Sequence, residues 1–510
     1  MARGEWWGRS RGWSAAVCLV WLDLGVPELE ELSREDLVAL VRVQAERIAE
    51  LEKANEELAG RLARLEHLLS RNSGNSSMPP SRDGDPGRSA PKPKRSAGGG
   101  KRSRGKQPGA PGSNLAWRQD PDDRVDRFPE GRCGCGADLA DARDLGITDQ
   151  YQQHEIPPLA VRVTQYDQHA VACGCGQVHT AERPAGARVG PVGYGPGLQA
   201  LAVYLLVVQF LPVGRVVALL ESLTGTAPSA GFVHGMLARA ADLLDAADKR
   251  IRALLTLAHV VSADETPLRV GPAGSKKYLL VSCTGLYTHY LLGRRDLDTF
   301  KKMAIAELAG GSVIVHDRYQ NYDADPFAHL RHQLCTSHLL RDVEAAVELY
   351  PDEHWPTQIR DALRGLVHQA NTARTAGADQ IDPEVKDELT RRFRQGVLVG
   401  LKTTGSHGNR PGERKTRLLL EELRDRPEDA LRFTTDLRVP PTSNQAERDL
   451  RPSKIQQNIS GRLTSEDRTR DRYRILGYLS TTAKHGLNQM AVLREAILGR
   501  PWMPALPDTT

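Results

Sequence analysis

Apolar residues recur in alternating steps of four and three between residues 37 and 69, which is the heptad spacing of a coiled coil. Asn55 falls at an a position of this heptad, where a buried asparagine typically selects a parallel dimer. Two oppositely charged pairs would face each other across such a dimer: Arg47 with Glu52, and Arg61 with Glu66. The pattern predicts a dimerising coiled coil over residues 29–70, and the alternative is an amphipathic helix packed on the chain's own core. The seam comprises Leu37, Val41, Gln44, Ile48, Leu51, Asn55, Leu58, Leu62, Leu65 and Leu69.

A second helical region is expected over residues 191–256. Apolar residues at helical spacing predict three helices between 197 and 247, with Pro212 ending the first, Gly225 in the turn after the second and Ser229 starting the third. A short helix, a glycine-containing turn and a longer helix form the helix-turn-helix layout of DNA-binding proteins. Plain helical bundles share this layout, so a bundle without DNA contacts is the alternative.

Short apolar runs replace the helical spacing after residue 257, which indicates strands. The first run ends at Asp264, and a later run ends at Asp317. An amphipathic helix over 296–308 separates them, so a right-handed crossover would place the two strands side by side, with both carboxylates at one mouth of the sheet. Three strands, a helix and a returning strand are the ribonuclease-H-like order. The expected strands are 259–264, 267–270, 278–284, 287–292, 312–317 and 333–335, followed by a helix over 336–349.

A third carboxylate is expected from a later helix, and Glu447 is the candidate. Thr442 and Gln445 have the spacing of a capping box, so a helix is predicted to begin there with Glu447 in its first turn. Acidic and basic groups on one helix suit a site that holds metal and phosphate together. The basic residues expected to contact DNA phosphate from this helix are Arg448, Arg451 and Lys454.

These three acids match the needs of DNA strand cleavage and joining. Two Mg²⁺ (or Mn²⁺) ions roughly 4 Å apart activate a water or a 3′-hydroxyl and stabilise the leaving oxygen of a phosphodiester. Hard cations take oxygen ligands and keep several waters, so Asp264, Asp317 and Glu447 suffice, with Asp264 bridging the ions. Any one of these acids alone has an ordinary interpretation, such as a turn cap or a surface acid. The prediction rests on their combination.

Positive charge is concentrated in one segment. The net charge of the 510 residues is +5, yet residues 71–106 hold ten Lys or Arg against two Asp. Residues 71–114 are rich in Ser, Pro and Gly and poor in apolar side chains, so a disordered basic linker is predicted there. Such a segment favours a polyanionic partner, most often nucleic acid, and the alternative is a linker that is only solvated.

Four of the seven cysteines form two C-x-C-G clusters that begin 40 residues apart. Thiolates are zinc ligands and glycine permits the tight turns, so the clusters predict one tetrahedral Zn²⁺ site within residues 115–190. The alternative is free thiols. The clustered residues are Cys133, Cys135, Cys173 and Cys175, and His154, His169 or His179 could replace one of them.

The N-terminal residues 1–28 carry an apolar run, 13–22, behind several arginines. Asp23 ends this run, no small-x-small cleavage site follows, and the run is too short to span a bilayer. We interpret residues 1–28 as a dispensable extension. A cytoplasmic protein without a membrane partner is expected.

Several motifs in the second half of the chain resemble the insertion sequence 66 family of bacterial transposases. They are Ser-Ala-Asp-Glu-Thr at 262–266, His-Asp-Arg-Tyr-Gln-Asn-Tyr at 316–322, Cys-Thr-Ser-His-Leu-Leu-Arg at 335–341, and Asn-Gln-Ala-Glu-Arg-Asp-Leu-Arg at 444–451 with Ser460-Gly461 after it. The coiled coil, an Asn-Ser-Ser-x-Pro-Pro linker at 75–80, a zinc-binding module and a helical domain before the core are also similar to this family. The resemblance extends over about residues 29–498.

The resemblance implies a DDE transposase that moves its own element, with Asp264, Asp317 and Glu447 as the triad. It implies a helical insertion, which residues 351–438 fit, and small accessory proteins encoded beside the gene. Cys335 and His338 match a family motif whose role the residues do not reveal; a metal site and packing of strand and helix are both open. His338 and Arg341 could instead approach substrate phosphate.

Taken together, the sequence predicts a multidomain α plus α/β protein that binds the ends of a DNA element. Its catalytic core would comprise residues 257–350 and 439–500, with a tail at 501–510. Two other functions remain open: another ribonuclease-H-like nuclease such as a resolvase, and a non-catalytic or defective DNA-binding protein descended from a transposase.

Overall fold

The structure is a computed structural model, and it describes residues 33–70, 115–185, 190–405 and 412–506. Within these ranges the chain is a mixed α/β protein, in agreement with the predicted α plus α/β class. The basic segment 71–114 and the extension 1–28 lie outside the described residues. The chain divides into two compact units, and the five-stranded sheet and the three predicted acids belong to the unit made of Lys92–Leu340, Asp361–Phe393 and Asp425–Thr510.

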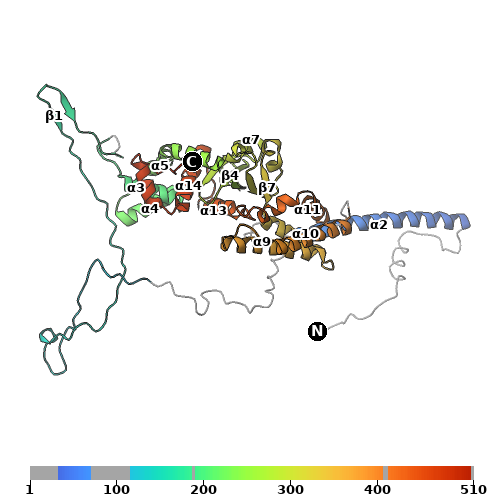
Figure 1. Ribbon diagram of the computed structural model, residues 1–510, viewed down its shortest axis with the longest axis horizontal. Helices are drawn as coiled ribbons and strands as arrows, with labels where there is room; N and C mark the ends of the chain where they lie inside the picture. The colour runs from blue at the N-terminus through green and yellow to red at the C-terminus, as the bar shows by residue number, and fades with distance from the viewer. Residues whose placement is uncertain (1–32, 71–114, 186–189, 406–411, 507–510) are drawn as a thin grey trace. The chain divides into compact units, whose positions relative to one another are not determined.

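Helix α2 spans Arg34–Ser70 without interruption, which confirms the helix expected from the heptad (Figure 1). Four apolar seam residues, Ile48, Leu51, Leu58 and Leu62, are between 55% and 59% exposed. Arg47 pairs with Glu50 of the same helix at 2.9 Å. Pairing of the exposed seam with a second chain stays a prediction.

Residues 115–185 have little regular structure. They contain the 3₁₀ turn η3 (Leu139–Asp141) and a hairpin of strands β1 (Ala170–Ala172) and β2 (Val178–Thr180). None of the residues between 115 and 185 is buried. A segment without an apolar core depends on some other source of stability, such as bound metal or a partner.

Three helices lie where the sequence predicts them between residues 197 and 247, and a fourth follows directly. Gly225 ends the second helix with φ of 68°, a left-handed conformation that glycine adopts without strain. The Ser229 side chain accepts a hydrogen bond from the N–H of Phe232 and so caps the third helix. The four helices are α3 (Pro196–Val207), α4 (Val213–Thr224), α5 (Ala230–Leu243) and α6 (Asp245–Thr256).

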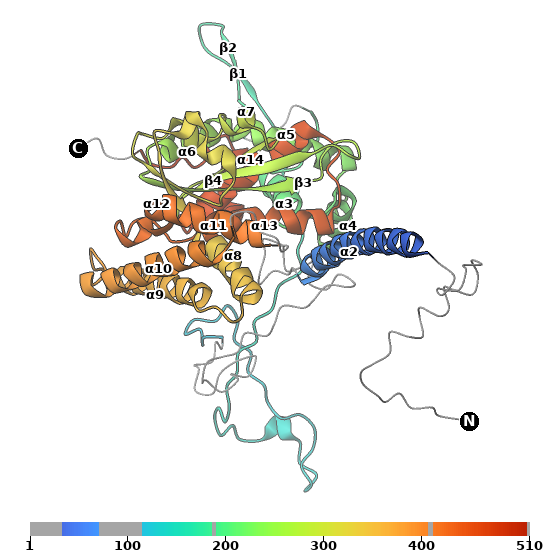
Figure 2. The same ribbon diagram turned by 90° about the vertical axis from the view of Figure 1, so that its right-hand side faces the viewer.

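The five-stranded sheet has the strand order β5-β4-β3-β6-β7, and its neighbouring strands β3 and β4 are labelled in Figure 2. Strand β4 is antiparallel to β3 and β5, whereas β6 is parallel to β3 and β7, so the two acid-bearing strands are neighbours as predicted. Asp264 lies within β3 and not at its end, because β3 continues through Pro267. Pairing with β6 stops at Ser262, which leaves an open strand edge where a proline is tolerated. The strands are β3 (Val260–Leu268), β4 (Lys277–Cys283), β5 (Thr288–Gly293), β6 (Val313–His316) and β7 (Arg331–Leu334).

The connection from β5 to β6 is not the single helix predicted over 296–308. It consists of the short helix α7 (Leu297–Phe300) and the 3₁₀ turn η4 (Ala304–Glu307), with Met303 extended between them. This break lets Phe300, Met303 and Ile305 enter one core, whereas a continuous helix would turn Ile305 away from Phe300.

Helices from the end of the chain cover one face of the sheet. Helix α13 (Asn444–Ile459) packs against β3 and β4, helix α14 (Glu466–Lys484) packs against β5, and α15 (Gln489–Ile497) packs against α3. A Cβ atom at Gly477 would lie 3.1 Å from the carbonyl oxygen of Thr288, so the close approach of α14 to β5 favours glycine there. The other face of the sheet buries Phe300, Tyr322 and Phe327.

The part of the chain that follows β7 and precedes α13 in the sequence is helical. Helix α8 (Thr336–Leu349) has the predicted bounds, and the helix-rich character expected for residues 351–438 is present in their described part. The helices there are α9 (Trp355–Thr375), α10 (Pro383–Thr403), α11 (Glu413–Asp425) and α12 (Pro427–Leu431).

Candidate active site

Asp264 and Asp317 lie at one edge of the sheet. The parallel pairing of β3 with β6 ends at Ser262 and Val315, and each aspartate follows two residues later. Because side chains alternate along a strand, both aspartates point toward the face that α13 covers. Both are half-buried. Backbone N–H groups hold them in place: that of Glu265 donates to Asp264 at 2.8 Å, and that of Tyr319 donates to Asp317 at 2.9 Å.

The electrostatic surroundings of Asp264 disfavour a bare negative charge. Burial is the main cause that raises the pKa of Asp264 well above its usual range, and the negative charges of Glu265 and Asp317 raise it further. The N–H of Glu265 and the nearby His338 act in the opposite direction. A carboxylate crowded by like charges is stabilised when a cation approaches, so this edge of the sheet favours cation binding.

Glu265 is a site residue that the sequence analysis did not single out. Its side chain is 1% exposed, accepts hydrogen bonds from Arg295 at 2.6 and 2.8 Å, and accepts another from the Tyr322 hydroxyl at 2.9 Å. The Arg295 guanidinium also lies 3.7 Å from the centre of the Tyr319 ring. Burial and the charge of Asp317 raise the pKa of Glu265 although Arg295 lowers it. These contacts tie the loop after Asp317 to β3.

Glu447 lies in the first turn of α13 and is half-buried. The predicted capping box is wrong. The N-cap residue is Ser443 and not Thr442, its side chain makes no capping hydrogen bond, and Gln445 donates to Asp449 at 2.9 Å instead of reaching back. Contacts with Cys335 and Thr336 hold the beginning of the helix, so Glu447 keeps its predicted place without the predicted cap.

The basic residues of α13 are on the surface. Arg448, Arg451 and Lys454 are exposed, and the Arg448 guanidinium donates to the carbonyl of Asn444 at 3.2 Å. Arg341, on α8, is half-buried. Contact of these side chains with DNA stays a prediction.

Cys335 and Thr336 link the end of β7 to the start of α13, and His338 contacts Cys335. The Ser443 N–H donates to the buried Cys335 sulfur at 3.3 Å, and Thr336 donates to the Pro441 carbonyl through its N–H at 2.9 Å and its hydroxyl at 2.7 Å. Burial opposes ionisation of Cys335, but hydrogen bonds from His338 and Ser443 outweigh it and lower the pKa of the thiol. These contacts position the first turn of α13, which carries Glu447.

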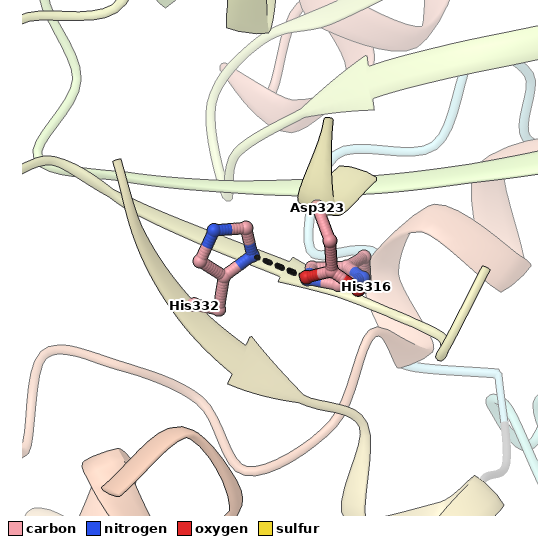
Figure 3. Close-up of side chains that lie close together, drawn as sticks. All are labelled: His316, Asp323 and His332. Atoms are coloured by element: carbon pink, nitrogen blue, oxygen red, sulfur yellow. Dashed lines mark hydrogen bonds and ion pairs between the residues drawn. The ribbon is translucent and has the colours of Figure 1, made fainter. Parts of the chain in front are cut away.

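Three side chains of kinds that commonly bind metal ions lie close together near this edge, and the sequence analysis did not predict them. Of the described residues, only His316, Asp323 and His332 bring three ligand atoms within 4.8 Å of one another (Figure 3). The carboxylates of Asp264, Asp317 and Glu447 therefore do not all lie within 4.8 Å of one another. Burial is the main cause that lowers the pKa values of His316 and His332, which favours the neutral form of each imidazole.

The two cysteine clusters adopt the same turn. In each, the N–H of the first cysteine donates to a carbonyl four residues later, and its own carbonyl accepts from a glycine with positive φ, Gly136 or Gly176. The N–H and thiol of the second cysteine lower the pKa of the first in both clusters, at Cys133 and Cys173. All four cysteines are exposed, and the structure does not bring the two pairs together.

A comparison with known protein families shows to which family the chain belongs. Residues 192–470, more than half of the chain, match the model described as Transposase IS66 family, and this range contains Asp264, Asp317 and Glu447. The chain belongs to the IS66 family of transposases. Membership confirms the resemblance noted in the motifs, and it implies DNA as a partner and general use of a divalent metal.

The N-terminal part of this IS66 family member matches a second model. Residues 26–116, which include α2, match a family of unknown function (DUF6444). No curated protein matches the chain. None of the helices described is long and apolar enough to cross a membrane.

Proposed function

We propose that the chain cleaves and joins DNA strands at the ends of its own element, with Asp264, Asp317 and Glu447 as the catalytic acids of a ribonuclease-H-like core. One observation carries this proposal: the parallel pairing of β3 with β6 brings Asp264 and Asp317 to one sheet edge. The strand order β5-β4-β3-β6-β7 is compatible with that core, and α13, which carries Glu447, packs on the same face.

The donor set fits Mg²⁺ or Mn²⁺. Asp264 and Asp317 offer half-buried carboxylate oxygens, the preferred ligands of hard cations, and their mutual repulsion is relieved by a cation. Glu447 would complete the set from α13. When bound, the ions supply an activated water or 3′-hydroxyl and neutralise the leaving oxygen.

The protein's own residues would hold and orient the reactants. Glu265 and Arg295 fix the loop that bears Asp317, and His338 lies close enough to Asp264 to influence its charge. Arg448, Arg451 and Lys454 present cations along the exposed side of α13, where DNA phosphate would bind, and His338 and Arg341 would add contacts from α8.

The other regions would bring DNA ends together. We propose that α2 forms a parallel homodimer through its seam, that helices α4 and α5 contact terminal repeats, and that the segment 71–114 follows DNA backbone. We also propose that the thiolates of the two similar turns at Cys133 and Cys173 hold one Zn²⁺ when the turns come together. Small accessory proteins would assist.

Strand cleavage by purified full-length protein tests the proposal. The substrate is a supercoiled plasmid that carries the gene with its flanking DNA, incubated with Mg²⁺. Asp264→Asn is expected to reduce cleavage by about a hundredfold or more and to leave DNA binding intact. Asp298→Asn is the matched control, because Asp298 is 89% exposed and lies in α7, outside the two strands and the helix that bear the predicted acids.

Each outcome of this experiment has a distinct meaning. Undiminished cleavage by the Asp264→Asn protein overturns the assignment of the acids. A wild-type chain that binds the flanking DNA but never cuts it supports the non-catalytic alternative. Cutting without any preference for the flanking DNA supports a different nuclease.

A further inference from the structure

We infer that His316, Asp323 and His332 form a second metal site, separate from the carboxylate site, which binds a transition metal such as Zn²⁺. The three side chains come from β6, the 3₁₀ turn η5 (Gln320–Asp323) and β7 (Figure 3). This inference does not depend on the proposed DNA chemistry.

The spacing of the ligand atoms fits a tetrahedral ion. The His316 Nε2 atom lies 2.9 Å from the His332 Nδ1 atom, and that Nδ1 atom lies 3.7 Å from the Asp323 Oδ1 atom. Zinc bonds of roughly 2.0–2.1 Å place neighbouring tetrahedral ligands roughly 3.3 Å apart, between these two distances. The 3.7 Å distance between His332 and Asp323 is too long for a hydrogen bond. Hydrogen bonds among the three side chains therefore do not explain why all three converge.

The two histidines lie on neighbouring strands of the sheet. Strands β6 and β7 are parallel, and His332 pairs with Ile314, two residues before His316. Both imidazoles therefore lie on the same face of the sheet. His316 is fully buried, and its Nδ1 atom has no hydrogen-bond partner among the described residues. Because Nε2 is the atom that faces His332, an ion would bind Nε2, and the buried Nδ1 atom would stay without a partner.

The carboxylate is also held in place. The Arg426 guanidinium donates to both oxygens of Asp323, at 2.8 and 3.0 Å, as outer-shell groups do around metal ligands. Asp429 lies 2.9 Å from Arg426 and 2.8 Å from Arg432, so the two arginines beside the site are balanced by the two carboxylates Asp323 and Asp429. The Asp323 side chain is 36% exposed, which gives an ion a route in and room for water as a fourth ligand.

Imidazole and carboxylate together select Zn²⁺ over Mg²⁺, which prefers oxygen ligands alone. An ion here would join β6, β7 and the loop that follows Asp317. It would thereby fix the loop behind the carboxylate site without touching the reacting DNA.

Zinc content per chain tests the site. Full-length protein is stripped with a chelator, dialysed against Zn²⁺ and analysed for bound metal. Asp323→Asn and His332→Gln are each expected to bind one equivalent less than wild type. Asp325→Asn, an exposed aspartate two residues from Asp323, should bind as wild type does. All these proteins carry the same cysteines, so zinc held by thiols cancels in the comparison.

A second measurement needs no variant. Hydrogen exchange of the wild-type chain is compared with and without Zn²⁺, and slower exchange is expected in residues 313–316 and 331–334, with no such effect from Mg²⁺. Equal zinc content in all four proteins overturns the site, and so does unchanged exchange in β6 and β7. Strand cleavage is not a readout in either measurement, so failure here leaves the proposed function unaffected.

Discussion

The ammonium of Lys484 lies 2.7 Å from a carboxylate oxygen of Asp449, and the two side chains are 12% and 7% exposed. Lys484 also donates to the carbonyls of Thr284 and Tyr287 at the β4–β5 turn. Asp449 is two residues beyond Glu447 on α13. This buried ion pair therefore joins α14, the sheet and the helix that carries the third predicted acid.

Lys484→Met is expected to loosen α13. A buried carboxylate that loses its cation costs about 3–5 kcal/mol, because Asp449 would keep only its neutral donors. Hydrogen exchange in residues 444–459 should become faster, and strand cleavage should fall with it. Arg500→Ala is the matched control: its partner Glu495 is on the surface, and exposed pairs contribute about 0–1 kcal/mol. Equal exchange in the two variants would contradict the anchoring role.

His289 and Asp248 make opposite contributions to acid stability. The His289 Nε2 atom lies 4.0 Å from the Asp248 carboxylate. Burial lowers the pKa of His289 to about 4, so folding loses stability as pH falls from about 6.5 to 4. Burial raises the pKa of Asp248 to about 6, so folding gains stability as pH falls from about 6 to 4. Each contribution amounts to about 3 kcal/mol, and in wild type they nearly cancel.

Replacing either residue alone should reveal how the other one changes the stability of the fold with pH. His289→Gln leaves the aspartate, so stability should rise on acidification from pH 6 to 4, whereas Asp248→Asn leaves the histidine and stability should fall. Urea unfolding followed by circular dichroism at several pH values measures both. Two flat profiles would show that neither group titrates differently in the folded chain.

The sequence predicts the strands and the place of the acids because both depend on local patterns. Runs of apolar residues ending in aspartate indicate β3 and β6, and the crossover rule makes them neighbours. The Glu447 helix is likewise found from its motif, although its predicted cap is replaced by contacts with Cys335 and Thr336 more than a hundred residues away. Contacts between residues so far apart in the sequence cannot be predicted from a local pattern.

The missed residues share this non-local character. Glu265 gains its role from Arg295, thirty residues later, and from Tyr322. His316 and His332 meet only because β6 and β7 pair in parallel. The break at Met303 also has a tertiary cause, the burial of Ile305, which outweighs the amphipathic spacing of residues 296–308.

Asp264→Asn should stabilise the metal-free protein. A carboxyl whose pKa is higher in the folded chain than in the unfolded chain destabilises the fold increasingly as pH rises through that pKa. The variant should therefore melt a few degrees above wild type at pH 8 when metal is removed, and the difference should shrink as the pH falls toward the unfolded-state pKa of about 4. Mg²⁺ should raise the melting temperature of wild type and of Asp298→Asn, but not that of Asp264→Asn. A response of the Asp264→Asn protein to Mg²⁺ equal to that of wild type would remove Asp264 from the ligand set.

Leu58→Asp should dissociate the dimer proposed for α2. Leu58 is at a d position and 59% exposed in the single chain, so a second helix would bury it, and an aspartate there would place a charge in the seam. Lys53→Asp introduces the same side chain at an outward f position and should leave the dimer intact. Asn55→Leu removes the polar a position and should give a more stable assembly with less strict stoichiometry. Sedimentation of full-length proteins gives their masses. If wild type and Leu58→Asp sediment alike, either as monomers or as dimers, the α2 seam is not what joins two chains.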